Sequence, residues 1–198
     1  NNNQVAFTNS STVATGTLQY SWDFGDGFTS TARDVTHNYG TPGIYQVKLV
    51  VTTNNGCKDS SSTTVNIFES PVAGFTANTA SQCFSNNQFS FTNTSSISAG
   101  SLQYTWDFGD GSFATATDVT HNYTAPGVYT VRLIALSDKN CSNEITTVIT
   151  VHPNPEADFN LNSAAAQCFK NNSFNFKNTT TITGGNLHYT WDMGNGDT

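Results

Sequence analysis

Two pairs of aspartates are the residues in this chain whose spacing first suggests chemistry. Each pair lies in the hexapeptide Trp-Asp-Phe-Gly-Asp-Gly, and clustered carboxylate oxygens are the ligands that calcium prefers. The spacing is not that of an EF-hand loop, and a third version of the hexapeptide has Asn195 instead of the second aspartate. We therefore expect no metal and predict that the first aspartate of each pair accepts backbone N–H bonds in a tight turn, with calcium as the weaker alternative. The four residues are Asp23, Asp26, Asp107 and Asp110.

Two histidines are the other residues that could act in catalysis. His37 and His121 each precede a tyrosine by two positions, and neither has a cysteine or serine nearby in a triad-like arrangement. We expect each histidine to hydrogen-bond across the edge of the fold. No convergent set of acid, base and nucleophile is present, so the sequence predicts a protein that is not an enzyme and needs no cofactor.

Composition and charge exclude further classes. Charged residues make up 11% of the 198 residues, and the net charge is -7, so no basic face is available to neutralise the phosphates of a nucleic acid. The longest apolar runs are far shorter than the roughly 20 residues that span a bilayer. Residues 1–4 show neither the basic nor the apolar region of a signal peptide, and we interpret the chain as an internal segment of a longer protein.

An internal repeat organises the chain. Trp22, His37 and Cys57 recur 84 positions later, and a second set of matches carries the pattern on to Trp191. We predict a first repeat that lacks its opening strand, a complete second repeat, and a third that ends after its Trp-containing hairpin. The predicted boundaries are 1–69, 70–152 and 153–198. Short Pro-containing linkers between them favour an elongated rod over freely swivelling domains.

Apolar residues alternate with polar ones throughout the second repeat. The pattern predicts strands at 73–77, 88–92, 102–108, 128–136 and 145–151, and no window shows the periodicity of an amphipathic helix. We therefore predict an all-β chain with about seven short strands in each repeat.

The recurring motifs resemble those of the PKD domain family. The hexapeptide is followed by His-Asn-Tyr-x-x-Pro-Gly-x-Tyr-x-Val at 37–47 and again at 121–131. The resemblance implies tandem immunoglobulin-like β-sandwiches, found mostly in extracellular proteins. In such sandwiches a Trp on a central strand fills the core, and a Tyr can anchor the corner before the closing hairpin. The aromatic residues that we assign to this structural core are Trp22, Trp106, Trp191, Tyr39, Tyr123, Tyr45 and Tyr129.

The four cysteines occupy two repeating places, which suggests disulfides formed in an oxidising compartment. One possible pairing joins Cys83 to Cys141 within the second repeat. The other joins neighbouring repeats, with Cys141 bonded to a cysteine before residue 1 and Cys83 bonded to one beyond residue 198. The immunoglobulin-like topology favours the second pairing, and both remain open at this point. The four residues are Cys57, Cys83, Cys141 and Cys168.

These features lead to two functional interpretations. The first is a non-catalytic stalk or filament segment of a large extracellular cell-surface adhesin, whose partners are neighbouring repeats, other copies of the chain, and surface glycans or proteins. The second is a carbohydrate-binding or spacer module of a secreted hydrolase. Sugar binding requires aromatic side chains on a solvent-facing sheet, whereas the alternation places most of these side chains inside.

Overall fold

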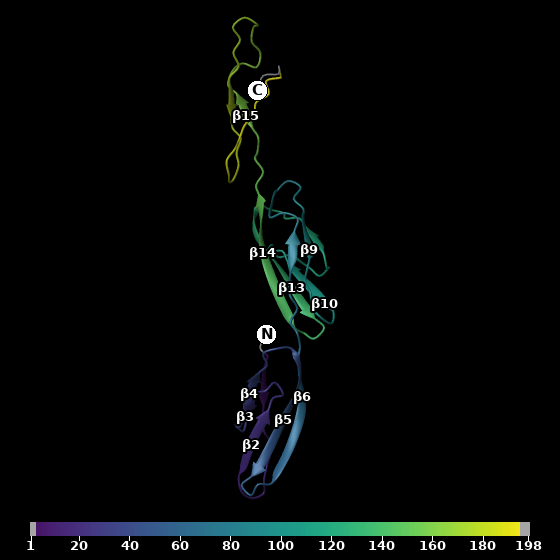
Figure 1. Cartoon of the computed structure of the whole chain (residues 1–198). Helices are drawn as coiled ribbons and strands as arrows, with labels where there is room; N and C mark the ends of the chain where they lie inside the picture. Colours follow the sequence, from purple (N-terminus) through teal and green to yellow (C-terminus); the bar gives the residue numbers. More distant parts are fainter. Residues whose placement is uncertain (1–2, 195–198) are drawn as a thin grey trace. The chain divides into compact units, whose positions relative to one another are not determined.

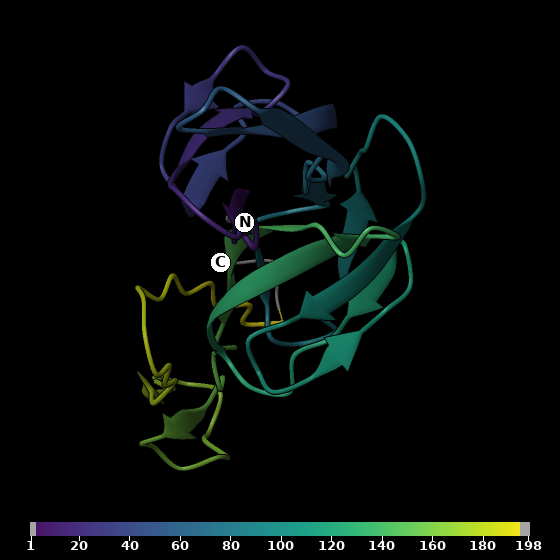
Figure 2. The same cartoon turned by 90° about the horizontal axis from the view of Figure 1, so that it is seen from below.

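The structure is a computed structural model that describes residues 3–194. Within this range the chain forms strands, turns and loops, and Figures 1 and 2 show no helix among them. Accordingly, the described residues contain no apolar helix of membrane-spanning length. Two compact units can be distinguished: one contains 1–72, 95–103 and 135–143, and the other contains 73–94, 104–134 and 144–198. These units do not follow the predicted repeat boundaries residue by residue, so those boundaries and the predicted rod remain predictions.

The first repeat contains a four-stranded sheet and a two-stranded sheet. The four-stranded sheet has the order β3-β2-β5-β6, and the smaller sheet pairs β1 with β4. All of these pairs are antiparallel, and β5 and β6 form a long hairpin in which Gly43 lies opposite Ile67. The strands are β1 (Gln4–Phe7), β2 (Leu18–Asp23), β3 (Thr29–Ser30), β4 (Val35–Asn38), β5 (Gly43–Thr53) and β6 (Lys58–Ile67).

The second repeat forms a fuller version of the same arrangement. A five-stranded sheet has the order β11-β10-β13-β14-β8, and a three-stranded sheet has the order β12-β9-β7. The short strand β8 runs parallel to the end of β14, which places Cys83 opposite His152. The strands are β7 (Phe75–Ala77), β8 (Ser81–Cys83), β9 (Phe89–Asn93), β10 (Leu102–Asp107), β11 (Phe113–Ala114), β12 (Val119–His121), β13 (Gly127–Ser137) and β14 (Ser142–His152).

The core of the second repeat lies between its two sheets. Alternation along β13 buries Val131 and Leu133 completely, and β9 contributes Phe91 from the facing sheet. Trp106 on β10 is fully buried among these side chains, and its indole N–H donates to the carbonyl of Ala116 at 3.0 Å. The apolar surface of the indole is therefore removed from water, and its one polar atom has a hydrogen-bond partner inside the sandwich. This fold is the predicted all-β, immunoglobulin-like sandwich.

The third repeat contributes one two-stranded sheet to the described residues. Strand β15 (Phe159–Leu161) pairs with β16 (Phe176–Asn178) in antiparallel orientation. The rings of Phe159 and Phe176 lie 5.5 and 5.9 Å from that of Trp191, which is only half-buried. Counterparts of β13 and β14 are absent from the described part of this repeat.

Replacing Trp106 with Ala should destabilise the second repeat by about 3 to 5 kcal/mol, because it removes the largest fully buried side chain and leaves a cavity. This is a large share of the roughly 5 to 15 kcal/mol that keeps a domain folded. Hydrogen exchange of the β13 amides under native conditions measures the loss. The half-buried Trp191 provides the matched control, and Trp191→Ala should leave β13 exchange unchanged. Equal protection of the β13 amides in the Trp106→Ala variant and the parent chain would refute the assignment of Trp106 as the side chain that fills this core.

Candidate functional site

The hexapeptide of the second repeat forms a turn whose carboxylates bind backbone amides. Asp107 accepts the N–H of Gly109 at 3.0 Å, and Asp110 accepts the N–H of Ser112 at the same distance. Gly109 has a φ of 79°, and a Cβ there would lie 2.7 Å from the carbonyl oxygen of Thr130, so only glycine fits. The first repeat repeats this geometry with Asp23 bound to Gly25 and Asp26 bound to Phe28.

The histidine reaches into this turn. His121 Nε2 lies 2.7 Å from Asp110 Oδ2, and the imidazole stacks on Phe108 with ring centroids 4.1 Å apart. The ring of Tyr123 lies perpendicular to the imidazole and packs against it, with the ring centroids 4.6 Å apart. The first repeat contains the same set, with His37, Asp26, Phe24 and Tyr39, and with His–Asp and ring distances of 2.7 and 4.1 Å.

Hydrogen bonding controls the electrostatics of this pair. Burial by itself raises the pKa of Asp110, but the hydrogen bonds from Ser112 and His121 outweigh burial and hold the pKa below its ordinary value. The pKa of Asp26 in the first repeat is lowered in the same way, with burial again opposed by His37 and the Phe28 amide. Each carboxylate is therefore kept ionised by donors from its own repeat.

The tyrosine of the second motif ties the two sheets together. The hydroxyl of Tyr123 donates to the carbonyl of Phe108 at 2.9 Å, and its ring stacks on Tyr129 at 4.0 Å. Burial raises the pKa of Tyr123 far above its usual range, with further contributions from Asp110, Tyr129 and Asp107, so the hydroxyl stays protonated as a donor. The equivalents in the first repeat are Tyr39 bonded to Phe24 at 3.2 Å and stacked on Tyr45.

An asparagine that the motifs did not reveal holds this tyrosine from the opposite side. Asn87 is buried and makes two bonds to the main chain of Tyr123: it accepts from the N–H at 2.8 Å and donates to the carbonyl at 2.9 Å. Asn3 donates to the carbonyl of Tyr39 in the first repeat. The 84-residue spacing of these asparagines was the available signal, but the abundance of Asn in the chain obscured it.

The two aspartates of the second repeat that were considered as calcium ligands interact with different partners. Asp107 also forms an ion pair with Arg132 at 3.3 Å, while Asp110 faces His121. Among residues 3–194, no three His, Cys, Asp or Glu side chains lie close enough together to hold a metal ion. In the third repeat Asp192 accepts from the N–H of Gly194 at 2.8 Å, and Asn195 lies outside the described residues. The arrangement makes these carboxylates parts of turns.

The cysteines are free thiols in the structure, and one predicted pairing is geometrically impossible. Cys141 directly precedes β14, whereas Cys83 lies opposite His152, the last residue of that strand. At about 3.3 Å per residue the two ends of β14 are roughly 30 Å apart, while a disulfide joins Cα atoms within about 7 Å. A Cys83–Cys141 bond within the second repeat is therefore excluded, and pairing between neighbouring repeats remains a prediction.

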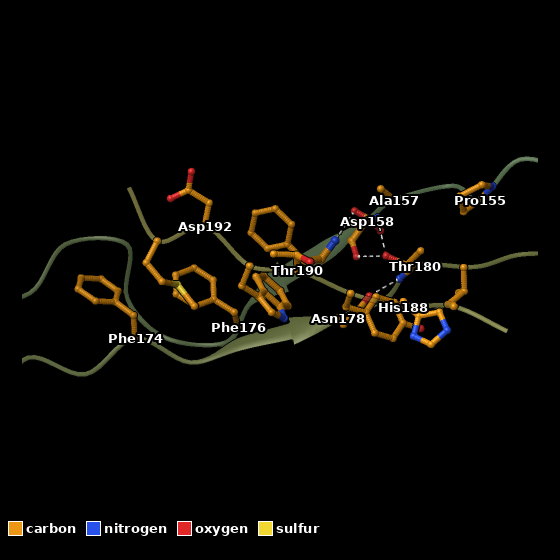
Figure 3. A pocket seen from close by; sticks show the side chains of 15 residues that line it. Pro155, Ala157, Asp158, Phe174, Phe176, Asn178, Thr180, His188, Thr190 and Asp192 are labelled. Carbon is orange, nitrogen blue, oxygen red and sulfur yellow. Dashed lines mark hydrogen bonds between the residues drawn. The ribbon is translucent and has the colours of Figure 1, made fainter. Parts of the chain in front are cut away.

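One cavity lies at the exposed inner face of the third repeat. It measures about 830 Å³, and Figure 3 shows Phe174 and Phe176 beside it, with Asp158 and Thr180 at its polar end. Its aromatic residues match the core of the second repeat, since Phe174 corresponds to Phe89 and Phe176 to Phe91. The cavity is thus one half of a sandwich core and not a ligand cleft with its own chemistry.

The second repeat therefore has the fold, the buried Trp and the corner tyrosine of the predicted sandwich, and the PKD domain family matches residues 1–67 and 68–151. The chain belongs to the PKD domain family. These matched residues form two PKD modules in tandem.

Several known proteins share part of this PKD sequence. The chain is 46% identical over 50 residues to Collagenase ColA of Clostridium perfringens, a match that covers 25% of the chain and 4% of the collagenase. It is 50% identical over 44 residues to the Microbial collagenase of Vibrio alginolyticus, with 22% and 5% covered. The crystal structure of the PKD1 domain from Vibrio cholerae metalloprotease PrtV is 34% identical, with 42% of this chain and 98% of that domain covered and a TM-score of 0.38. The PKD segment thus spans only a small fraction of the length of the collagenases that it matches.

Acid should weaken the PKD repeats through Asp26 and Asp110. Because the folded-state pKa of each lies below its unfolded value, their stabilisation is complete above the unfolded pKa, near 4, and is lost as the pH falls through the folded pKa. Asp110→Asn should lower stability at pH 7 by about 1 kcal/mol and flatten the decline below pH 4. Thermal midpoints between pH 7 and 2.5 measure both effects. Asp59→Asn, at an exposed position of β6, should change neither, and an Asp110→Asn profile parallel to that of the parent chain would disprove the role of the pair.

Proposed function

We propose that this chain is a non-catalytic spacer module of a secreted hydrolase. The observation that carries the proposal is that the polar side chains of the motifs are already hydrogen-bonded within their own repeat. In both repeats the histidine, the two aspartates and the tyrosine hydrogen-bond to groups of their own repeat, as His121, Asp107, Asp110 and Tyr123 do in the second. Side chains held in this way maintain a rigid domain and leave no acid, base or nucleophile directed at a substrate.

The relatives support the hydrolase context. The matched proteins include collagenases of Clostridium perfringens and Vibrio alginolyticus, and the solved PKD1 domain comes from a metalloprotease. In each case the PKD segment accounts for a minor part or a separate domain of a larger enzyme. This context favours the hydrolase interpretation over the adhesin stalk, and it also favours an extracellular or secreted location.

The position of the aromatic residues favours a spacer over a carbohydrate-binding module. Sugar-stacking sites need neighbouring aromatic rings on a solvent-facing surface. The most exposed aromatics of the two matched repeats are Phe28 and Phe113, at 66% and 65%, and they do not occupy equivalent positions. The second repeat has Ser112 where the first has Phe28, so the two repeats share no such platform.

Binding and hydrolysis assays can test the spacer function. The purified chain should release no fluorescence from labelled gelatin, and it should stay in the supernatant when sedimented with insoluble collagen, cellulose or chitin. Phe28→Ser, which gives the first repeat the residue of the second, should behave identically to the parent. Saturable pelleting with one of these polymers that is lost in Phe28→Ser would overturn the spacer proposal in favour of a binding module.

A further inference from the structure

Two loops of the second repeat belong to the same compact unit as the first repeat. Residues 95–103 and 135–143 group with residues 1–72, whereas the rest of the second repeat lies in the other unit. The linker, residues 68–72, follows β6 and lies in the first unit together with both loops. Its contacts with the loops are therefore contacts within one compact body.

The end of the linker is hydrogen-bonded to the first of these loops, residues 95–103. Val72 and Ser96 form an isolated antiparallel bridge in which each main-chain N–H donates to the carbonyl of the other, at 2.8 and 2.9 Å. Just before this bridge Pro71 is fully buried, and the hydroxyl of Ser98 donates to the carboxylate of Glu69. The end of the linker is therefore part of the folded structure.

The start of the linker packs against the hairpin turn between β13 and β14. Lys139 Nζ lies over the ring of Phe68, 6.0 Å from its centroid, a distance at which a cation and an aromatic ring attract each other. Cys141 Sγ lies 4.0 Å from the carbonyl oxygen of Phe68. The turn thus contacts both the side chain and the main chain of one linker residue.

The turn is held in shape by its own hydrogen bonds. The N–H of Asn140, which has a φ of 60°, donates to the carbonyl of Ser137 at 3.0 Å, and the N–H of Cys141 donates to the hydroxyl of Ser137 at 3.1 Å. The N–H of Asp138 donates to the carbonyl of Ser101 at 3.1 Å, which joins the turn to the first loop. A surface that is already ordered loses little conformational freedom when it packs against the linker.

The equivalent turn of the first repeat differs at the position that contacts the ring. Residues 54–57 read Asn-Asn-Gly-Cys, so Asn55 stands where the second repeat has Lys139, and Cys57 stands where it has Cys141. The N–H of Cys57 makes the same hydrogen bond, to Thr53 Oγ1 at 3.1 Å. Cys57 is nevertheless exposed, whereas Cys141 is half-buried. The lysine and the covered thiol thus distinguish the turn that meets the linker.

We propose that Phe68, Lys139 and Cys141 form a joint that holds the linker, and the first repeat with it, against the two loops of the second repeat. The joint is closed while the ring of Phe68 lies beneath the Lys139 ammonium, and Cys141 is then covered. Bending at the start of the linker has to break these contacts, which opens the joint and exposes the thiol. The inference concerns the coupling of two repeats and does not depend on the spacer function.

The reaction rate of each thiol measures the joint directly. The reduced chain is alkylated with iodoacetamide, and the label on each cysteine is quantified by mass spectrometry of the peptides. Cys141 should react more slowly than Cys57, because access limits the reaction of a covered thiol. Lys139→Asn gives the turn the residue of the first repeat and should raise the Cys141 rate about two- to fivefold, the value of an exposed cation–π contact. Lys139→Arg keeps a cation that stacks on aromatic rings and should leave the rate unchanged.

Phe68→Ala removes the other half of the contact. It should raise the Cys141 rate at least about fivefold, and Lys139→Asn should add nothing in that background, because the cation no longer has a ring to contact. Cys57 should react at the same rate in every variant. The thermal midpoint should also stay unchanged, since the ring of Phe68 is 48% exposed and belongs to neither core.

NMR relaxation supplies a second measurement that does not use the thiols. The rotational correlation time obtained from the amides of β5 and β9 should fall in Phe68→Ala, because each repeat then tumbles more independently. Three outcomes would each overturn the joint. These are equal alkylation rates at Cys141 and Cys57 in the parent chain, additive effects of Phe68→Ala and Lys139→Asn, and a correlation time that Phe68→Ala leaves unchanged.

Discussion

The burial of one indole on a central strand is the constraint on which each repeat depends. Strand β10 lies between β11 and β13 within its sheet, so the ring of Trp106, which projects from one face of that sheet, is buried only when a second layer of strands lies over that face. Strands β9 and β7 provide that layer through Phe91 and Phe75. Because the indole N–H is bonded to a carbonyl of its own repeat, burial incurs no unsatisfied donor.

The described residues contain different parts of this core in the three repeats. In the first, Trp22 keeps its bond to Ala32, no counterpart of β7 lies among residues 3–194 beside β1, and a groove of about 330 Å³ lies next to Trp22. In the third, Trp191 has the covering pair β15 and β16 but no counterpart of β13 and β14 among the described residues, and a cavity of about 830 Å³ remains. Each cavity therefore lies beside a Trp whose described surroundings lack a counterpart of a strand that covers Trp106 in the second repeat.

Periodicity predicts the parts of the fold whose side chains enter the core. Alternation places the long strands β13 and β14 and the Trp-bearing β10 correctly. Apolar and polar residues alternate along these strands because every second side chain is buried. The short strands β8, β11 and β12 were not predicted, because two or three residues carry no periodic signal and only an existing partner strand defines them. At the site, the turn chemistry of Asp107 followed from its glycines, whereas the bond between His121 and Asp110 depends on how the chain returns to the turn.

The cysteines show how this topology limits covalent reinforcement. The residue before β14 and the residue opposite its far end are separated by the full length of an 11-residue strand. Any disulfide of Cys83 or Cys141 must therefore use a thiol from outside the second repeat. Such a bond leaves the folding free energy of each sandwich to its packing and hydrogen bonds, and it restricts only the motion between the groups that it joins. Sequence spacing alone allowed either pairing, and the parallel register of β8 decides against the internal one.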